Sequence, residues 1–271
     1  MNEEPLIALL ADVWESIATV CAPLAEADYD LPTDCPGWTV RDQLAHVAGT
    51  ESMLLGRSPE ATATDTSALA HVRNDIGAMN EQWVEAFRQR SGAETLAAFV
   101  EVTAERLTVL RAMSADDWDR EGFTPEGPGP YRQFMAIRVF DSWFHEQDIR
   151  EAVGVAGGLD GPVADFALSR VPRALPFVVG KRAGAPQGAT VVFEVAGATP
   201  IEIAVGVDGR AAVLDSIPHE PTVRIRTDRR TFARLAGGRR SGLDALGRGE
   251  VTIEGDRALG EAVVANLGYT I

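Results

Sequence analysis

The spacing of apolar residues changes its period along the chain, and this change constrains the fold more than any other sequence feature. In the first half, apolar residues recur every three to four positions, as at Leu6, Leu10, Val13 and Ile17, which is the spacing of one helix face. From Ala189 onward they alternate with polar residues, as in half-buried strands. The sequence therefore predicts an all-helical first half and a small α+β second half with a mostly antiparallel sheet.

A glycine-rich stretch separates the two patterns. Gly157-Gly158 and Gly161-Pro162 follow the last long helical pattern, and no strand pattern precedes them. They indicate a linker rather than a phosphate-binding loop. We therefore expect a multidomain chain, with a helical bundle over residues 1–155 and an α+β domain over residues 160–271.

Caps and helix breakers give the expected limits of the elements. Thr39, followed three residues later by Asp42, resembles a capping box that starts the second helix. In the first half we expect helices at residues 4–27, 39–56, 74–90, 93–113 and 131–153, with loops at 57–70 and 122–130. In the second half we expect a proline-interrupted helix at 162–180, strands at 190–195, 201–207, 211–214, 222–226 and 251–254, and short helices at 228–235, 242–246 and 257–267.

Charge and composition exclude several classes of partner. The formal net charge of −15 argues against nucleic acid and anionic membrane surfaces, which require a basic protein surface. No apolar stretch approaches the roughly 20 residues of a membrane span, and the N-terminus lacks the pattern of a secretory signal. We therefore expect a cytoplasmic protein that acts on small molecules. Lys181 is the single lysine among 25 basic residues, which suggests a GC-rich, actinobacterial source.

Two of the four histidines suggest a metal site. Asp141 precedes His145 by four residues on the long helix, so both side chains lie on one helical face. His46 lies among small apolar residues on the second helix and faces the bundle. Two imidazoles and one carboxylate form a three-ligand set that suits zinc and leaves one coordination position open. Spacing alone leaves an alternative, in which Asp141 and His145 stabilise the helix and His46 is an ordinary core histidine.

The remaining candidate residues have simpler explanations. Glu51, Glu146 and Asp148 lie near the three predicted ligands in sequence, where they could compete as ligands or serve as outer partners of the metal. The simpler interpretation of each is a surface or structural charge. We expect His71 and His219 to be exposed and uninvolved. Cys21 lies in an apolar helical stretch and Cys35 in a turn; the two do not form a CxxC pair, and neither is expected to be catalytic.

Several segments resemble a known family. The stretch Cys35-Pro-Gly-Trp-Thr-Val-Arg-Asp-Gln-Leu-Ala-His-Val47 is similar to a signature of the mycothiol-dependent maleylpyruvate isomerase family, which belongs to the DinB/YfiT-like group. The segment from Phe140 to Arg150 resembles the family's second signature. Arg73 to Gly77 and Asn80-Glu81 resemble its middle segment. The resemblance implies a DinB-like four-helix bundle followed by a sterol-carrier-protein-like domain.

The resemblance also implies a chemistry. It implies Zn²⁺ bound by a histidine of the second helix and by an acid-x-x-x-His pair, which map to His46, Asp141 and His145. It implies mycothiol as co-substrate, with the metal activating its thiol to attack a small electrophile. An arginine that holds substrate carboxylates maps to Arg73. The isomerase has glutamate where this chain has Asp141, and this departure weakens the transfer of activity more than that of metal binding.

Three functional hypotheses follow. The first is a zinc- and mycothiol-dependent isomerase or S-transferase acting on a small electrophile. The second is a zinc hydrolase that activates water. Either enzyme would need a general base, for which Glu51 and Asp148 are the nearby candidates. The third is a metal-containing module that binds a ligand without turnover. In each case we expect a monomer or a homodimer.

Overall fold

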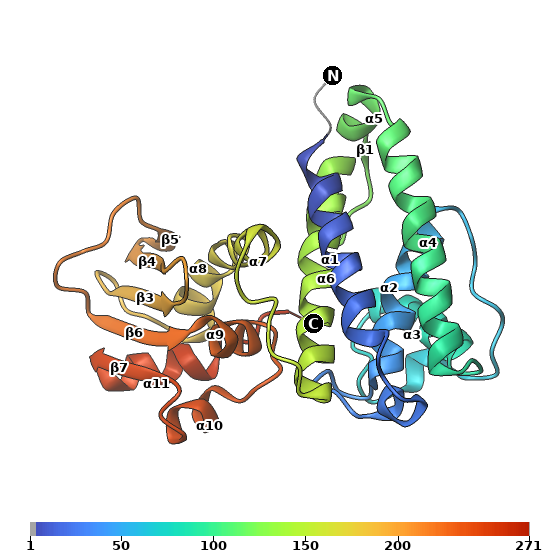
Figure 1. Ribbon diagram of the computed structural model, residues 1–271. Coiled ribbons are helices and arrows are strands. Elements are labelled where there is room, and N and C mark those ends of the chain that lie inside the picture. Colours follow the sequence, from blue (N-terminus) through green and yellow to red (C-terminus); the bar gives the residue numbers. More distant parts are fainter. Residues whose placement is uncertain (1–3, 271) are drawn as a thin grey trace. The chain divides into compact units, whose positions relative to one another are not determined.

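The computed structural model describes residues 4–270, and the chain divides between Gly158 and Leu159 into two compact units (Figure 1). The first unit is all helical apart from one very short ladder, and the second combines helices with a five-stranded sheet. This confirms the predicted fold class. None of the helices within residues 4–270 is both long enough and apolar enough to cross a bilayer.

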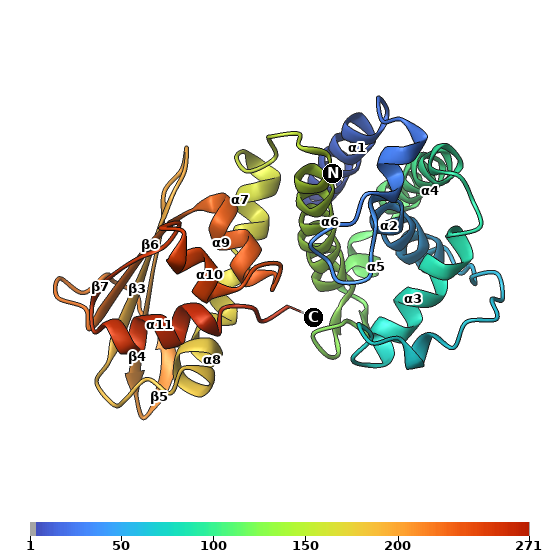
Figure 2. The same ribbon diagram turned by 90° about the horizontal axis from the view of Figure 1, so that it is seen from below.

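Four long helices form the bundle of the first unit. The helix α1 packs against α4 and α6, and α2 packs against the same two helices. The shorter α3 lies outside the bundle beside α2 (Figure 2). Buried apolar side chains, such as Leu10, Leu44, Phe99 and Trp143, fill the centre. The elements of this unit are α1 (Pro5–Cys21), η1 (Glu26–Asp30), α2 (Val40–Leu54), η2 (Thr66–Ala68), α3 (Asp75–Phe87), α4 (Gly92–Ala112), α5 (Ala115–Asp119), β1 (Glu121–Gly122), β2 (Gly129–Pro130) and α6 (Tyr131–Val153).

The first helix ends earlier than predicted. The expected helix at residues 4–27 stops at Cys21. Pro23 explains the difference, because proline has no backbone N–H with which to continue the helical hydrogen bonds. The chain continues into the 3-10 turn η1. There the Glu26 carboxylate accepts a hydrogen bond from the backbone N–H of Gly92 at 2.6 Å, so this turn caps the N-terminus of α4.

Gly49 allows α2 and α3 to approach closely. A Cβ atom at this position would lie 2.4 Å from the Cβ of Trp83, which is far too close for two carbon atoms of separate residues. Glycine inside a helix costs roughly 1 kcal/mol relative to alanine. The close packing of Trp83 over the backbone of α2 explains why glycine occupies this position.

The two loops predicted in the first unit contain short regular pieces. The loop at 57–70 includes the 3-10 turn η2. The loop at 122–130 is closed by a two-residue antiparallel ladder, in which Glu121 pairs with Pro130 and Gly122 with Gly129. This ladder joins the end of α5 to the start of α6.

The second unit is built around one mixed sheet with the strand order β5-β4-β3-β6-β7. The central pair β3 and β6 is parallel, and the other three pairs are antiparallel. The segment predicted as an interrupted helix is broken into short pieces around Pro172 and Pro176, as those residues predict. The elements are α7 (Pro162–Leu168), η3 (Val171–Arg173), α8 (Leu175–Phe177), η4 (Val178–Arg182), β3 (Thr190–Ala196), β4 (Ile201–Asp208), β5 (Arg210–Val213), β6 (Val223–Asp228), α9 (Arg229–Ala236), α10 (Gly242–Gly247), β7 (Thr252–Gly255) and α11 (Arg257–Ala265).

The two faces of this sheet differ in chemistry. Helices cover one face (Figure 2), where the ring of Phe193 on β3 packs 6.2 Å from that of Phe232 on α9. The opposite face carries ion pairs, in which Glu194 of β3 binds Arg224 and Arg226 of the neighbouring β6. Strand alternation alone predicts this separation of apolar and charged residues.

Candidate metal centre

The loop before α2 is fixed by its own polar groups. Thr39 caps the helix: its hydroxyl accepts from the N–H of Asp42, and the Asp42 carboxylate accepts from the N–H of Thr39 at 2.9 Å. The predicted capping box is therefore confirmed. Asp42 also accepts two hydrogen bonds from Arg88, at 3.0 and 3.1 Å. These contacts set the position of Trp38, the residue before the cap.

The three predicted ligands lie together in the bundle. His46 comes from α2, and Asp141 and His145 come from α6. One potential ligand atom of each lies within 4.8 Å of those of the other two. Nε2 of His46 is 3.1 Å from Oδ2 of Asp141, and Nε2 of His145 is 3.4 Å from Oδ1 of the same carboxylate. Within residues 4–270 no other group of three His, Cys, Asp or Glu side chains has this geometry.

The protonation of His145 suits metal binding. Its Nδ1 lies 2.5 Å from the amide oxygen of Gln43, one helical turn before His46 on α2. An amide oxygen can only accept a hydrogen bond, so Nδ1 carries a proton, and Nε2 is the atom that would bind a metal. An outer partner of this kind is typical of histidines that bind metals.

His46 differs from His145 in its surroundings. Its Nδ1 is buried and has no hydrogen-bond partner among the described residues. Burial lowers the pKa of His46 to about 4 and outweighs the attraction of the Asp141 carboxylate. The ring is therefore neutral at pH 7, and neutral imidazole is the form that binds a metal.

Asp141 provides the negative charge and the access to solvent. Burial raises the pKa of its carboxyl, but the nearby Arg138, His46 and His145 outweigh that effect and hold it well below the usual value. The Asp141 side chain is 27% exposed, whereas those of His46 and His145 are 4% and 7% exposed. One carboxylate and two imidazoles are a donor set that suits zinc.

Trp38 covers both imidazoles, a contact that was not predicted from the sequence. Its ring centroid lies 5.1 Å from that of His46 and 5.7 Å from that of His145. The indole N–H donates to the Glu81 carboxylate at 2.7 Å, and Glu81 is only 1% exposed. The tryptophan is thus held by a residue outside the ligand cluster. In the sequence, only the Pro-Gly-Trp segment could have indicated this contact.

The prediction that His71 is exposed and uninvolved is wrong. Its Nε2 lies 3.0 Å from the Glu81 carboxylate, and its side chain is only partly exposed. It also packs against Gly37, where a Cβ atom would lie 2.5 Å from the ring. His71 therefore supports the loop that carries Trp38. His219 is exposed, as predicted.

The nearby acids have defined structural partners. Glu51 is fully buried, and its two oxygens accept from Arg106 and Arg138 at 2.9 and 2.8 Å. The hypothesis that Glu51 acts as a general base is therefore wrong, because the carboxylate is enclosed and two guanidinium groups occupy both of its oxygens. Glu146 accepts from Ser16 and Arg150. Asp148 is buried, with its carboxylate 3.9 Å from Nδ1 of His145.

Arg73 does not lie in a buried site. It is exposed just before α3, and its side chain forms no hydrogen bond or ion pair with any residue in the range 4–270. The two cysteines are free, and burial raises the pKa of Cys21 to about 12, so that its thiol remains protonated.

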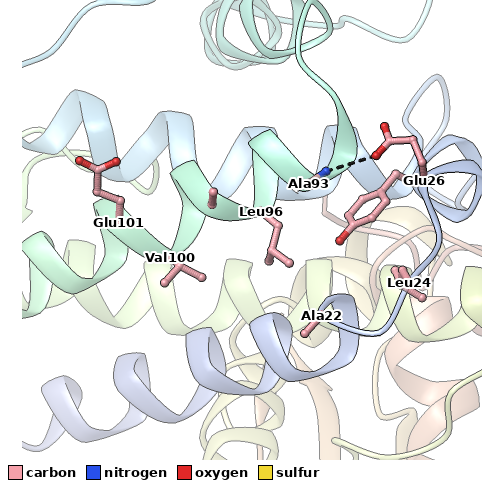
Figure 3. Close-up of a pocket in the computed structure, with 9 residues that line it drawn as sticks. Ala22, Leu24, Glu26, Ala93, Leu96, Val100 and Glu101 are labelled. Atoms are coloured by element: carbon pink, nitrogen blue, oxygen red, sulfur yellow. Dashed lines mark hydrogen bonds between the residues drawn. The ribbon is translucent and has the colours of Figure 1, made fainter.

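Two pockets of the helical unit lie apart from the three predicted ligands. One, of about 600 Å³, is lined mainly by small apolar residues after α1 and along α4, including Ala22, Leu96 and Val100 (Figure 3). A second, of about 730 Å³, includes Arg106 and Tyr131. Neither is lined by His46, Asp141 or His145.

Fold and site together define a two-domain protein whose helical bundle carries a cluster with the composition of a metal centre. The model of the mycothiol maleylpyruvate isomerase N-terminal domain matches residues 10–150, and that of the MDMPI C-terminal domain matches residues 165–262. The chain belongs to the mycothiol maleylpyruvate isomerase family, which confirms the resemblance seen in the sequence.

Solved structures support the same fold. A crystal structure of the mycothiol-dependent maleylpyruvate isomerase is 18% identical, with a TM-score of 0.56, and the match covers 89% of this chain and 93% of that one. A histidine-to-alanine mutant of that enzyme is also 18% identical, with a TM-score of 0.58 and coverage of 94% and 96%. No curated protein matches the chain.

Proposed function

We propose that this chain is a zinc-dependent enzyme that uses mycothiol to attack a small electrophile. The observation that carries the proposal is the convergence of His46, Asp141 and His145 from two facing helices. A zinc ion bound there would stabilise the thiolate form of mycothiol at neutral pH. Family membership supports the thiol as co-substrate.

The residues of the chain prepare this site in four ways. Gln43 fixes the tautomer of His145, so that its Nε2 lone pair points to the site. Burial keeps His46 neutral. Asp141 supplies one negative charge and is the predicted ligand that solvent and small molecules can reach. Trp38 covers both imidazoles.

The family favours isomerisation over transfer. In an isomerisation, the mycothiol sulfur bonds to one carbon of an activated cis double bond, and the π electrons move to the conjugated carbonyl. Rotation about the resulting single bond and cleavage of the C–S bond then give the trans product and regenerate the thiolate. In an S-transferase the C–S bond would remain. Arg73 is exposed, and its proposed role in holding a substrate carboxylate rests on the family resemblance.

Metal analysis and thiol titration test the proposal. The purified chain should contain close to one zinc per chain, and its cobalt form should develop thiolate-to-cobalt absorption when mycothiol is added. His46→Ala and Asp141→Asn should lose the metal, whereas His219→Ala, an exposed histidine of the other unit, should keep it. Full metal content in His46→Ala would refute the ligand set. Metal binding without thiol ligation would instead favour a hydrolase or a ligand-binding module.

A further inference from the structure

We propose that Arg138 is a positioning residue of the metal centre, which holds the carboxylate of Asp141 by linking it to the buried Glu51. The inference rests on the metal site of the proposed function. Arg138 is not one of the predicted ligands. Its proposed role is to orient the ligand Asp141, without contact to the substrate.

The helix α6 places the two groups in contact. Arg138 precedes Asp141 by three residues, so both side chains lie on one face. One terminal nitrogen of the guanidinium donates to Oδ2 of Asp141, and its Nε donates to Oε1 of Glu51 at 2.8 Å. The Arg138 side chain is 3% exposed. A single planar group thus connects a carboxylate of α2 with a carboxylate of α6.

Glu51 is itself fixed from the opposite side. Nε of Arg106 on α4 donates to its second oxygen at 2.9 Å, and a terminal nitrogen of Arg106 donates to the hydroxyl of Tyr131 at 2.7 Å. Three helices therefore determine the position of Arg138. The two guanidinium groups and the two carboxylates of this network balance in charge.

Two features indicate a role beyond stability. Buried ion pairs contribute little net stability compared with well-packed apolar residues, so stability alone is a poor reason for this network. In addition, the remaining terminal nitrogen of Arg138 is buried without a hydrogen-bond partner among the described residues. The guanidinium is thus oriented by Glu51 and Asp141 at the cost of one unsatisfied donor. Within the network, Asp141 is the group that faces the two imidazoles.

The expected consequence is a change in metal affinity. Without Arg138 the partly exposed Asp141 carboxylate would sample other rotamers, and metal binding would have to order it. Loss of an outer partner of a ligand typically weakens metal binding by about 10- to 100-fold. The charge of Arg138 acts in the opposite direction, because a guanidinium repels an incoming cation. Weaker binding after its removal would therefore identify positioning as the dominant effect.

The test is a cobalt titration of the full chain after chelation. Arg138→Gln should weaken Co²⁺ binding by about 10- to 100-fold and change the d–d absorption of the bound ion. Arg138→Lys should recover part of the affinity, because lysine keeps the charge but not the fixed fork. Arg132→Gln is the matched control: it removes another arginine of α6, one that pairs with Glu4 and Asp119 outside this network, and it should leave the affinity unchanged.

The double variant Glu51→Gln/Arg138→Gln removes opposite charges together and covers the case in which Arg138→Gln does not fold. It should also bind cobalt more weakly. Unchanged or tighter binding in either variant would overturn the inference, as would an equal loss of affinity in Arg132→Gln. If the unsubstituted chain bound no cobalt, the proposed function would fail first, and this inference with it.

Discussion

The amide oxygen of Gln43 lies 2.5 Å from Nδ1 of His145, across the contact between α2 and α6. Gln43 is fully buried, and its amide nitrogen donates to the hydroxyl of Thr33 at 2.7 Å. The amide is therefore held from the loop before α2, and it fixes which nitrogen of His145 faces the metal centre.

Replacing Gln43 by leucine should weaken metal binding without removing a ligand. The His145 ring would lose the acceptor that fixes its tautomer, and such losses cost about 10- to 100-fold in affinity. Competition with a chromophoric chelator would measure the zinc dissociation constant. Gln133→Leu, on the same helix as His145 but bonded only to the exposed Glu126, should bind zinc normally. Equal affinities for Gln43→Leu and the unsubstituted chain would show that the tautomer is fixed by another group.

The free energy of unfolding of the metal-free helical unit should decrease as the pH is lowered, because of His46. Burial lowers its pKa to about 4 in the folded chain, against 6.5 for an unperturbed histidine. Between these values the unfolded chain binds a proton that the folded chain does not, so acid favours unfolding. His46 should account for about 2 kcal/mol of lost stability between pH 7 and pH 5. Below pH 4 its contribution should become constant.

Urea unfolding followed by tryptophan fluorescence would measure this effect. All five tryptophans lie between residues 14 and 143, so their emission reports the helical unit. His46→Gln should remove this part of the pH dependence. An identical pH dependence in His46→Gln would show that other groups are responsible.

Trp38 should act as an intrinsic reporter of the metal. Its ring lies within 6 Å of both imidazoles, and an ion such as Co²⁺ at that distance quenches indole emission. Cobalt should therefore reduce the fluorescence of the chain, and Trp38→Phe should lose most of that reduction. Trp118→Phe, which removes a tryptophan packed against Tyr131, should keep it. Quenching that survives in Trp38→Phe would place the ion closer to another tryptophan.

Gly49 should tolerate no side chain. Gly49→Ala would place a Cβ atom 2.4 Å from that of Trp83, and overpacking of this kind typically costs about 1–3 kcal/mol. Gly77→Ala is the control, because its Cβ would meet neighbours no closer than 3.5 Å, and it should gain up to about 1 kcal/mol in helix propensity. The two free energies of unfolding should thus change in opposite directions; a stabilised Gly49→Ala would contradict the packing of α2 against α3.

The sequence determined the secondary structure and the candidate ligands, because both depend on local patterns. The change of apolar period separated helices from strands, Thr39 and Asp42 marked the start of α2, and four-residue spacing placed Asp141 and His145 on one face. The predicted end of α1 was wrong, because the apolar period does not show that Pro23 stops the helix.

Only the tertiary structure decided which groups surround those ligands. The contacts of His145 with Gln43, of Trp38 with Glu81, and of Arg138 with Glu51 join residues on different elements, and no spacing along the chain encodes them. Glu51 was the plainest case. From the sequence it was a candidate base, and in the fold two buried guanidinium groups occupy its oxygens. A carboxylate's role depends on the charges and solvent around it, and packing alone determines these.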